Sequence, residues 1–316
     1  MTTTMEKLKV GDFAIESDES LIQQMREVVH GCAPVLKYCK SIGMTDEVID
    51  ANVIKVYEYA RDCNYCKKCP GLKKCKKENA YLNSKVTYAN GVVETQLIPC
   101  RELLKRVSFE RQFQVKDFPD EWLDARVADY DYKLRVDSEK NKNNPIKKSL
   151  ENLTLYEVGK ETRWVYMCGA NRTGKSYLAA VMAIDLAKKE NKGQVPVCYI
   201  NASKRFRELC DIERKNPEEF KRKLEMYCTV PALVIDDFGN EFKNDFVRDA
   251  IVKEIITSRC SKRLYTIFTS NFTLDQIEIL YSGKDPASAI MAGQIVKTIR
   301  AMCTKEIDFG DIPLYQ

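Results

Sequence analysis

The stretch from Gly169 to Ser176 reads Gly-Ala-Asn-Arg-Thr-Gly-Lys-Ser and matches the phosphate-binding pattern G-x-x-x-x-G-K-[ST]. An apolar run that reads as a strand precedes it, and a helix is expected to begin at Lys175. Glycines let backbone N–H groups wrap around phosphates, and the helix N-terminus adds positive charge. We expect Lys175 to reach the β- and γ-phosphates and the Ser176 hydroxyl to bind Mg²⁺. The residues predicted to bind ATP are Gly169, Ala170, Asn171, Arg172, Thr173, Gly174, Lys175, Ser176 and Tyr177.

Two acids, Asp236 and Asp237, end an apolar run farther along the chain. A carboxylate at the end of a buried strand can hold Mg²⁺, and we assign Asp236 to this role. Asp237 is expected to polarise the water that attacks the γ-phosphate, although many ATPases have glutamate at this place. Asn271 ends the next apolar run and can orient that water, with Thr269 and Ser270 as weaker candidates for the same role. Together these residues predict an ATPase.

Three arginines are candidates for contact with the nucleotide. Arg259 ends an amphipathic stretch and is predicted to complete the ATP site of a neighbouring subunit as an arginine finger. A solvated cation at a helix end is the alternative reading of Arg259, and Arg263 is the second candidate for the finger. Arg300 is predicted to contact nucleotide from a helix near the end of the sequence.

A second chemistry is suggested by cysteines that lie about a hundred residues before the phosphate loop. Cys66 and Cys69 have the C-x₂-C spacing of a zinc site, Cys100 closes a predicted hairpin, and either Cys75 or Cys63 can supply the fourth thiolate. The lysines between these residues would help to neutralise the thiolates. Such a site would be structural, because four thiolates leave no open position. Reduced cysteines buried in a core are the alternative.

The predicted elements that hold these residues differ between the two halves of the chain. Residues 18–62 show helical spacing over three segments, the third of which begins after Thr45 and continues through Tyr57, and Asn90-Gly91 predicts a hairpin turn. From residue 151 onward, apolar runs alternate with helical patterns, which predicts a parallel α/β sheet covered on both faces. The four expected strands are 163–169, 195–200, 232–239 and 265–271.

Length and composition agree with this organisation. The chain has 316 residues, 44% hydrophobic residues and a net charge of +5, which permits contact with nucleic acid without requiring it. We expect two domains, 1–108 and 109–316. No apolar run is long enough to span a membrane, and the first residues lack a secretory signal. We therefore expect a cytoplasmic protein whose 13 cysteines are reduced.

The sequence resembles a known family. Residues 110–316 are similar to the AAA+ ATPase domain of the bacterial replicative helicase loaders DnaI and DnaC. The stretches that carry the resemblance are GANRTGKSYL, KLEMYCTVPALVIDDFGNEF, SRCSKRLYTIFTSNF and AGQIVKTIR. Residues 63–100 resemble the zinc-binding N-terminal region of DnaI through CKKCPGLKKC and IPC. This resemblance favours Cys75 over Cys63 as the fourth ligand, and the sequence does not distinguish a cellular from a phage origin.

The resemblance implies an AAA+ P-loop ATPase domain that follows a small helical zinc-binding domain. It implies that the first domain binds the hexameric replicative helicase, and that the second uses ATP, self-associates and contacts single-stranded DNA. Two departures are visible: DnaI has a histidine zinc ligand where this chain reads Tyr-Leu-Asn-Ser at 81–84, and Thr298 stands where the family favours an arginine. Arg300 would replace that arginine after a shift in register.

Three functions compete at this point. The first is an ATP-dependent loader that places the replicative helicase on single-stranded DNA, with slow ATP hydrolysis that the partner stimulates. The second is a transposition helper ATPase of the IstB type, which acts on duplex DNA, and the zinc-like N-terminal half disfavours it. The third is an adaptor that uses nucleotide as a switch with little hydrolysis, which Asp237 in place of glutamate keeps open. For DNA contact the candidates are Lys204, Arg205 and Arg207, with a solvated helix start as the alternative.

Overall fold

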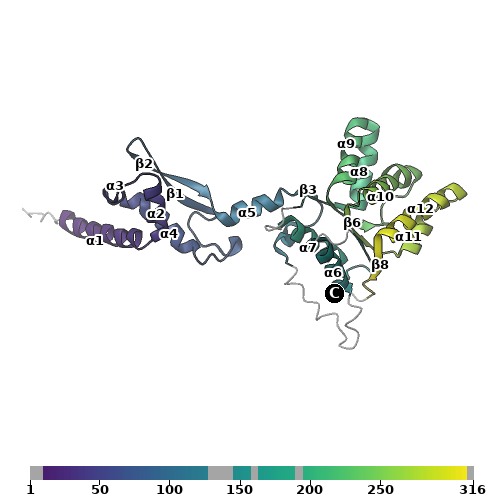
Figure 1. The fold of residues 1–316 in the computed structure, drawn as a ribbon, viewed down its shortest axis with the longest axis horizontal. Coiled ribbons are helices and arrows are strands. Elements are labelled where there is room, and N and C mark those ends of the chain that lie inside the picture. Colours follow the sequence, from purple (N-terminus) through teal and green to yellow (C-terminus); the bar gives the residue numbers. More distant parts are fainter. Residues whose placement is uncertain (1–9, 127–144, 158–162, 189–194, 312–316) are drawn as a thin grey trace, which may run out of the picture. The chain divides into compact units, whose positions relative to one another are not determined.

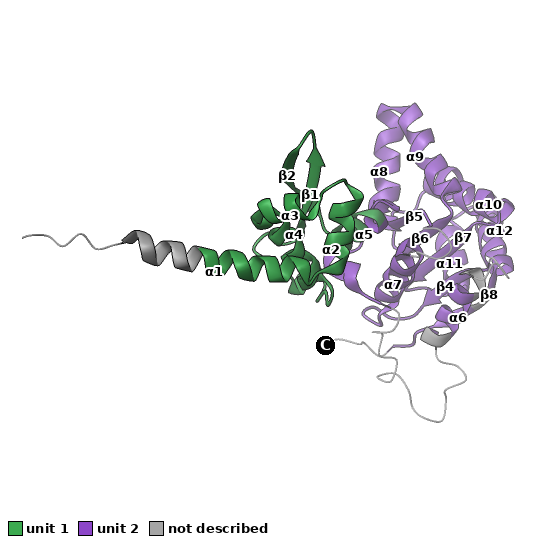
Figure 2. Ribbon diagram, turned by 60° about the vertical axis from the view of Figure 1, so that its left-hand side comes forward, with its two compact units in different colours: residues 1–108 green, residues 109–316 purple. Residues whose placement is uncertain are grey.

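The structure, a computed structural model, describes residues 10–126, 145–157, 163–188 and 195–311. The chain forms two compact units, Met1–Ser108 and Phe109–Gln316, which Figure 2 colours separately. Among the described residues, one hydrophobic core lies in unit 1 and two lie in unit 2. Each unit is therefore described by itself.

Unit 1 packs helices against a two-stranded hairpin (Figure 1). Asn90 and Gly91 form the hairpin turn with φ of 51° and 79°, which confirms the turn that the Asn-Gly pair predicts. The elements are α1 (Val10–His30), α2 (Ala33–Ser41), α3 (Asp46–Ala51), α4 (Val53–Cys66), η1 (Leu72–Lys74), β1 (Leu82–Ala89), β2 (Val92–Pro99) and α5 (Arg101–Glu110), whose last residues belong to unit 2.

The third predicted helix of unit 1 is in fact two helices. Thr45 caps α3 by accepting the N–H of Val48, as expected, but α3 ends before Asn52. The Asn52 side chain donates to the Val48 carbonyl at 3.0 Å, and such local bonds compete with the helical ladder. The chain restarts as α4, and residues of α1, α2, α4 and both strands share one core.

Unit 2 is built on a six-stranded parallel sheet with the order β3-β5-β6-β7-β4-β8. The predicted strands are its four central ones, which confirms the expected α/β class. The two edge strands, β3 and β8, were not predicted from the sequence, because β3 is short and β8 (CTKEID) has too few apolar residues to be recognised as a buried strand. The strands are β3 (Phe113–Lys116), β4 (Trp164–Cys168), β5 (Val197–Asn201), β6 (Ala232–Phe238), β7 (Tyr265–Ser270) and β8 (Cys303–Asp308).

Helices cover both faces of this sheet (Figure 1). One core contains residues of α6 (Pro145–Glu157) and α7 (Lys175–Lys188). The core on the other face contains residues of α8 (Ala202–Lys215), α9 (Pro217–Thr229), η6 (Val247–Val252), α10 (Lys253–Ser261), α11 (Leu274–Tyr281) and α12 (Pro286–Met302). Within the described ranges, no helix is long and apolar enough to cross a lipid bilayer.

The parallel order of the strands determines where the candidate residues lie. The carboxyl ends of parallel strands meet at one edge of a sheet, which is where ligands bind in open α/β folds. The phosphate loop follows β4, the two acids end β6, and Asn271 follows β7. Because β7 lies between β4 and β6, the three groups are brought to neighbouring positions.

Candidate active site

The loop between β4 and α7 has a backbone that only a glycine-rich sequence allows. Gly169 and Gly174 have φ of 134° and 88°, in the region that favours glycine. A Cβ on Gly169 would lie 2.9 Å from the carbonyl oxygen of Gly310, just beyond β8. That carbonyl also accepts the N–H of Ala170 at 3.0 Å. The first glycine of the pattern is therefore required by the close approach of the chain after β8.

Lys175 lies inside this loop with 6% of its surface exposed. Its ammonium donates to the carbonyl oxygens of Gly169 and Ala170, both at 2.7 Å. It also lies 3.4 Å from Oδ1 of Asn271 after β7. The structure thus brings together the two residues that the sequence assigned to the phosphate loop and to the orientation of water.

The carboxylate of Asp236 lies beside Ser176 and Thr269. The Thr269 hydroxyl donates to Asp236 Oδ1 at 2.6 Å. Burial raises the pKa of Asp236, and hydrogen bonds from Thr269 and Ser176 oppose that shift. One hydroxyl and one carboxylate are the hard oxygen donors that Mg²⁺ prefers, so Ser176 and Asp236 fit the predicted metal role. When bound there with ATP, Mg²⁺ would neutralise phosphate charge.

Asp237 adopts a left-handed conformation with φ of 62°, which is uncommon for a residue other than glycine. It lies where the pairing of β6 with β7 shifts register, between Ile235 and Phe238. Its N–H donates to Thr269 Oγ1 at 3.0 Å, and Asn271 Nδ2 approaches its Oδ1 at 3.5 Å. The bulge interrupts the regular alternation of side chains along β6 and places the Asp237 side chain beside Asn271.

Thr269 has a larger role in this site than the sequence analysis gave it. Its hydroxyl donates to the carboxylate of Asp236 and accepts the N–H of Asp237, so one buried side chain fixes both acids. The sequence marked Thr269 only as a weaker alternative to Asn271. No local pattern shows that the strand bearing it lies beside the strand bearing the acids.

The predicted arginine finger at Arg259 is wrong. Arg259 has 0% of its surface exposed, so its guanidinium cannot reach a neighbouring subunit. It donates to Thr266 Oγ1 at 2.9 Å and to the carbonyl oxygens of Tyr227, Val230 and Tyr265 at 2.6–2.9 Å. These bonds join α10 to the end of α9 and the start of β7, and satisfy carbonyls that burial would otherwise leave without partners.

Arg300 is half exposed and pairs with two carboxylates near the start of α11 and on β8. Its guanidinium lies 2.5 Å from Asp275 Oδ1 and 3.8 Å from Glu306 Oε1. The neighbouring Thr298 donates to the carbonyl of Gln294 within its own helix. The contacts found for Arg300 are thus with α11 and β8, and the nucleotide role remains a prediction.

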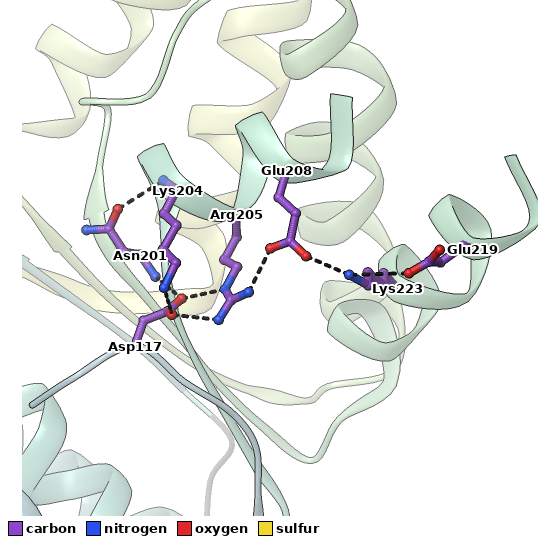
Figure 3. Close-up of polar contacts among 7 residues, drawn as sticks. All are labelled: Asp117, Asn201, Lys204, Arg205, Glu208, Glu219 and Lys223. Atoms are coloured by element: carbon purple, nitrogen blue, oxygen red, sulfur yellow. Dashed lines mark hydrogen bonds and ion pairs between the residues drawn. The ribbon is translucent and has the colours of Figure 1, made fainter. Parts of the chain in front are cut away.

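The basic residues at the start of α8 belong to an ion-pair network (Figure 3). The Asp117 carboxylate, which follows β3 and is nearly fully buried, accepts two bonds from Arg205 at 2.6 and 2.7 Å and one from Lys204 at 3.0 Å. Arg205 continues to Glu208, which binds Lys223 of α9. Arg205 therefore joins α8 to the segment after β3, and its contact with DNA stays a prediction that competes with these ion pairs.

The predicted zinc ligands do not form a metal site in this arrangement. Among the described residues there is no group of three or more His, Cys, Asp or Glu side chains that could hold a metal ion. Cys69 is exposed, and the other four are half buried. Cys66 Sγ lies 3.7 Å from Asn83 Oδ1, and Cys100 Sγ accepts the N–H of Leu103 at 3.4 Å. The residues as placed do not fit a four-thiolate zinc site.

A buried ion pair shapes the cysteine loop instead. Lys77 Nζ lies 2.9 Å from Asp62 Oδ1, with side-chain exposures of 9% and 7%. Lys77 also donates to the Leu82 carbonyl and to Asn83 Oδ1, and Asp62 accepts the N–H of Ser84 at 2.6 Å. This pair joins α4, the loop and β1. Nothing in the local sequence pattern distinguishes Lys77 from the other lysines, so this ion pair could not be predicted from the sequence.

Comparison with known proteins agrees with this geometry. Residues 84–303 match the model of the family described as IstB-like ATP binding protein. The chain is 23% identical to the replicative helicase loader DnaI of Bacillus subtilis (strain 168) over 285 residues, which is 88% of each chain. A crystal structure of DnaI matches with a TM-score of 0.51 and 29% identity, covering 63% of this chain and 97% of that one.

A crystal structure of the DnaC helicase loader is also similar, with 21% identity and a TM-score of 0.45 over 60% of this chain and 99% of that one. The family model covers more than half of the chain, including the phosphate loop, both acids and Asn271. The parallel sheet carries these residues at its carboxyl edge, as an AAA+ P-loop ATPase domain requires. The chain therefore belongs to the family of IstB-like ATP binding proteins.

Proposed function

We propose that this protein is a helicase loader, which binds the replicative DNA helicase and uses ATP to help place it on single-stranded DNA when replication begins. The observation that carries the proposal is the extent of the match to a replicative helicase loader. An alignment that spans 88% of this chain must reach well into unit 1, since unit 2 begins only at Phe109. The similarity thus includes both units and extends beyond the ATPase domain.

The proposal divides the work between the two units. Unit 1 would bind the helicase and unit 2 would bind ATP and single-stranded DNA and self-associate, in the cytoplasm. Hydrolysis would be slow and stimulated by the partner. Arg263, which is exposed two residues before β7, is now the candidate for a finger between subunits.

The test uses the full chain and the replicative helicase from the same source. We expect the two proteins to co-purify, and helicase bound to single-stranded DNA to increase when this protein and ATP are both added. The Lys175→Ala variant should co-purify with the helicase and fail in the loading step. Absence of any complex with the helicase would refute the loader function.

A second candidate is the transposition helper that the name IstB suggests, because the family model matches most of unit 2. The two functions separate on DNA: the loader should prefer single strands, and a helper should bind duplex DNA and a transposase. Preference for duplex DNA together with no helicase complex would favour the helper.

The nucleotide switch with little hydrolysis is a third candidate, which aspartate at position 237 keeps open. It predicts tight ATP binding and phosphate release that helicase and single-stranded DNA do not stimulate. Stimulated turnover under those conditions would exclude it.

Zinc is a separate proposal, which rests on the cysteine spacing and the family resemblance alone. Because the described cysteines do not gather into a site, binding would require the cysteine loop to rearrange around the ion. The proposal predicts about one zinc per purified chain, lost in Cys69→Ser and retained in Cys210→Ser, whose cysteine lies in unit 2. Metal analysis that finds no zinc in the unsubstituted chain would remove the proposal.

A further inference from the structure

A buried carboxyl group lies four residues after Asp237, in the turn that follows β6. Glu241 has 2% of its surface exposed. One carboxylate oxygen accepts the N–H of Gly239 at 2.8 Å, and the other accepts the hydroxyl of Tyr281, the last residue of α11. Burial raises the pKa of Glu241, and these two hydrogen bonds oppose the shift. Both oxygens are thus committed inside the protein, so Glu241 cannot itself be the base that activates water.

The turn that Glu241 holds has no free space around it. Gly239 has φ of 92°, and a Cβ at this position would lie 2.4 Å from Ile277 Cδ1 and 2.9 Å from Phe272 Cδ2. Ile277 belongs to α11, and Phe272 follows Asn271 directly. The turn is therefore wedged between α11 and the end of β7.

The same turn determines the position of Asp237. The N–H of Asn240 donates to the Asp237 carbonyl at 3.2 Å, and the Asn240 side chain donates to Asp237 Oδ1. The left-handed φ of Asp237 is costly and persists only where the surroundings hold it. Thr269 holds it from one side, and the turn closed by Glu241 holds it from the other.

We propose that Glu241 is a positioning residue for ATP hydrolysis, which fixes the turn carrying Asp237 and joins that turn to α11 through Tyr281. The inference rests on the ATPase function proposed above. It gives Asp237 its defined place although its side chain is one methylene shorter than the glutamate of many ATPases. It also means that a shift of the end of α11 changes the geometry at Asp237.

The test compares three variants of the full chain. In Glu241→Ala the turn loses both bonds, and we expect kcat to fall about tenfold to a hundredfold, since small displacements at a reacting centre have effects of that size. Affinity for ATP should stay within about twofold, because the hydrogen bonds described for the Glu241 carboxylate go to Gly239 and Tyr281 and not to the phosphate loop. Glu241→Gln should restore most of the activity, since its amide can accept from Gly239 and donate to Tyr281. Tyr281→Phe should lower kcat severalfold, and Tyr227→Phe, which removes a buried hydroxyl elsewhere in unit 2, should not.

A fall in kcat without a fall in ATP affinity distinguishes a positioning role from a general role in stability. Equal loss in Glu241→Ala and Glu241→Gln, parallel loss of ATP affinity, or unchanged kcat would each overturn the inference. If Glu241→Ala fails to fold, Tyr281→Phe decides the matter by the same criteria.

Failure of the ATPase function itself would be seen first in the unsubstituted chain. If that chain shows no hydrolysis, amide hydrogen exchange tests the positioning role of Glu241 without any measurement of ATPase activity. Glu241→Ala, or Tyr281→Phe in its place, must then speed exchange in residues 237–242 and leave residues 165–180 unchanged. Unchanged exchange in 237–242 would overturn the inference.

Discussion

The carboxyl edge of the sheet in unit 2 and the cysteine loop of unit 1 both carry short motifs, and the two motifs have different outcomes. At the sheet edge, Lys175, Asp236 and Asn271 come from three strands' ends and converge, because the strands are parallel neighbours. In unit 1, the cysteines come from a helix end, a loop and a strand end, and the described residues do not gather them. A motif predicts geometry well when regular elements flank it on both sides.

The strongest test of the sheet edge is Lys175→Ala. We expect nucleotide-dependent ATP hydrolysis to fall by about 10²–10³-fold, as when a preorganised donor to a developing charge is removed. Steady-state hydrolysis and fluorescent-nucleotide binding measure it. Lys188→Ala, at the other end of the same helix, is the control and should hydrolyse ATP normally. Normal hydrolysis by Lys175→Ala would contradict the assignment of an ATP site to this loop.

The corresponding test in unit 1 is Asp62→Asn. It leaves Lys77 buried without its charge partner, and we expect the free energy of unfolding of unit 1 to fall by about 3 kcal/mol. Urea unfolding followed by circular dichroism measures it. Asp46→Asn breaks the exposed pair with Lys40 and should change stability by less than about 1 kcal/mol. Equal effects would show that the buried pair does not determine the loop.

A smaller effect on stability is expected at Asp117, the buried carboxylate after β3 that pairs with Arg205 and Lys204. Burial alone would raise its pKa, but hydrogen bonds from Arg205 and Lys204 hold the pKa of Asp117 below its ordinary value. The stability that the ionised group contributes is full above the ordinary aspartate pKa and is lost as pH falls through the lower folded value. Asp117→Asn should cost about 2 kcal/mol at neutral pH.

The pH dependence checks the cause of that loss. The acid decline in unfolding free energy should be shallower in Asp117→Asn than in the unsubstituted chain. Asp211→Asn, an exposed aspartate on α8, should leave both the neutral stability and the acid decline as they were. A parallel acid decline in Asp117→Asn would contradict the ion-pair explanation.

The smallest effect concerns DNA. Arg207 is exposed on α8, whereas Arg205 is bound to Asp117 and Glu208. We expect Arg207→Ala to weaken single-stranded DNA binding severalfold and to reduce the salt slope by about one. Arg26→Ala in unit 1 is the control, and fluorescence anisotropy at several salt concentrations measures both. An unchanged salt dependence of DNA binding in Arg207→Ala would contradict a contact between Arg207 and DNA.

Sequence reasoning predicted the four central strands, because apolar runs are a local property, and it named the residues that the carboxyl edge of the sheet brings together, whose role in ATP binding stays a prediction. It placed Arg259 wrongly, since a helix-end arginine looks the same in sequence whether it is solvated or bonded to buried carbonyls from α9 and β7. It gave no weight to Glu241, although the residue lies in the stretch that resembles the family. The partners of both residues are distant in sequence, so only the assembled sheet shows their roles.

The contact between Gly310 and the phosphate loop bears on how the protein is made. Ala170 N–H is satisfied by the Gly310 carbonyl, and Phe309 donates to the carbonyl of Cys168. About 140 residues must therefore be synthesised after the loop before its support exists. During translation, a nascent chain displays a complete phosphate-binding motif long before the ribosome has released the strand that secures it. The capacity to hold nucleotide is expected to arise only after β8 has been synthesised and has joined the edge of the sheet.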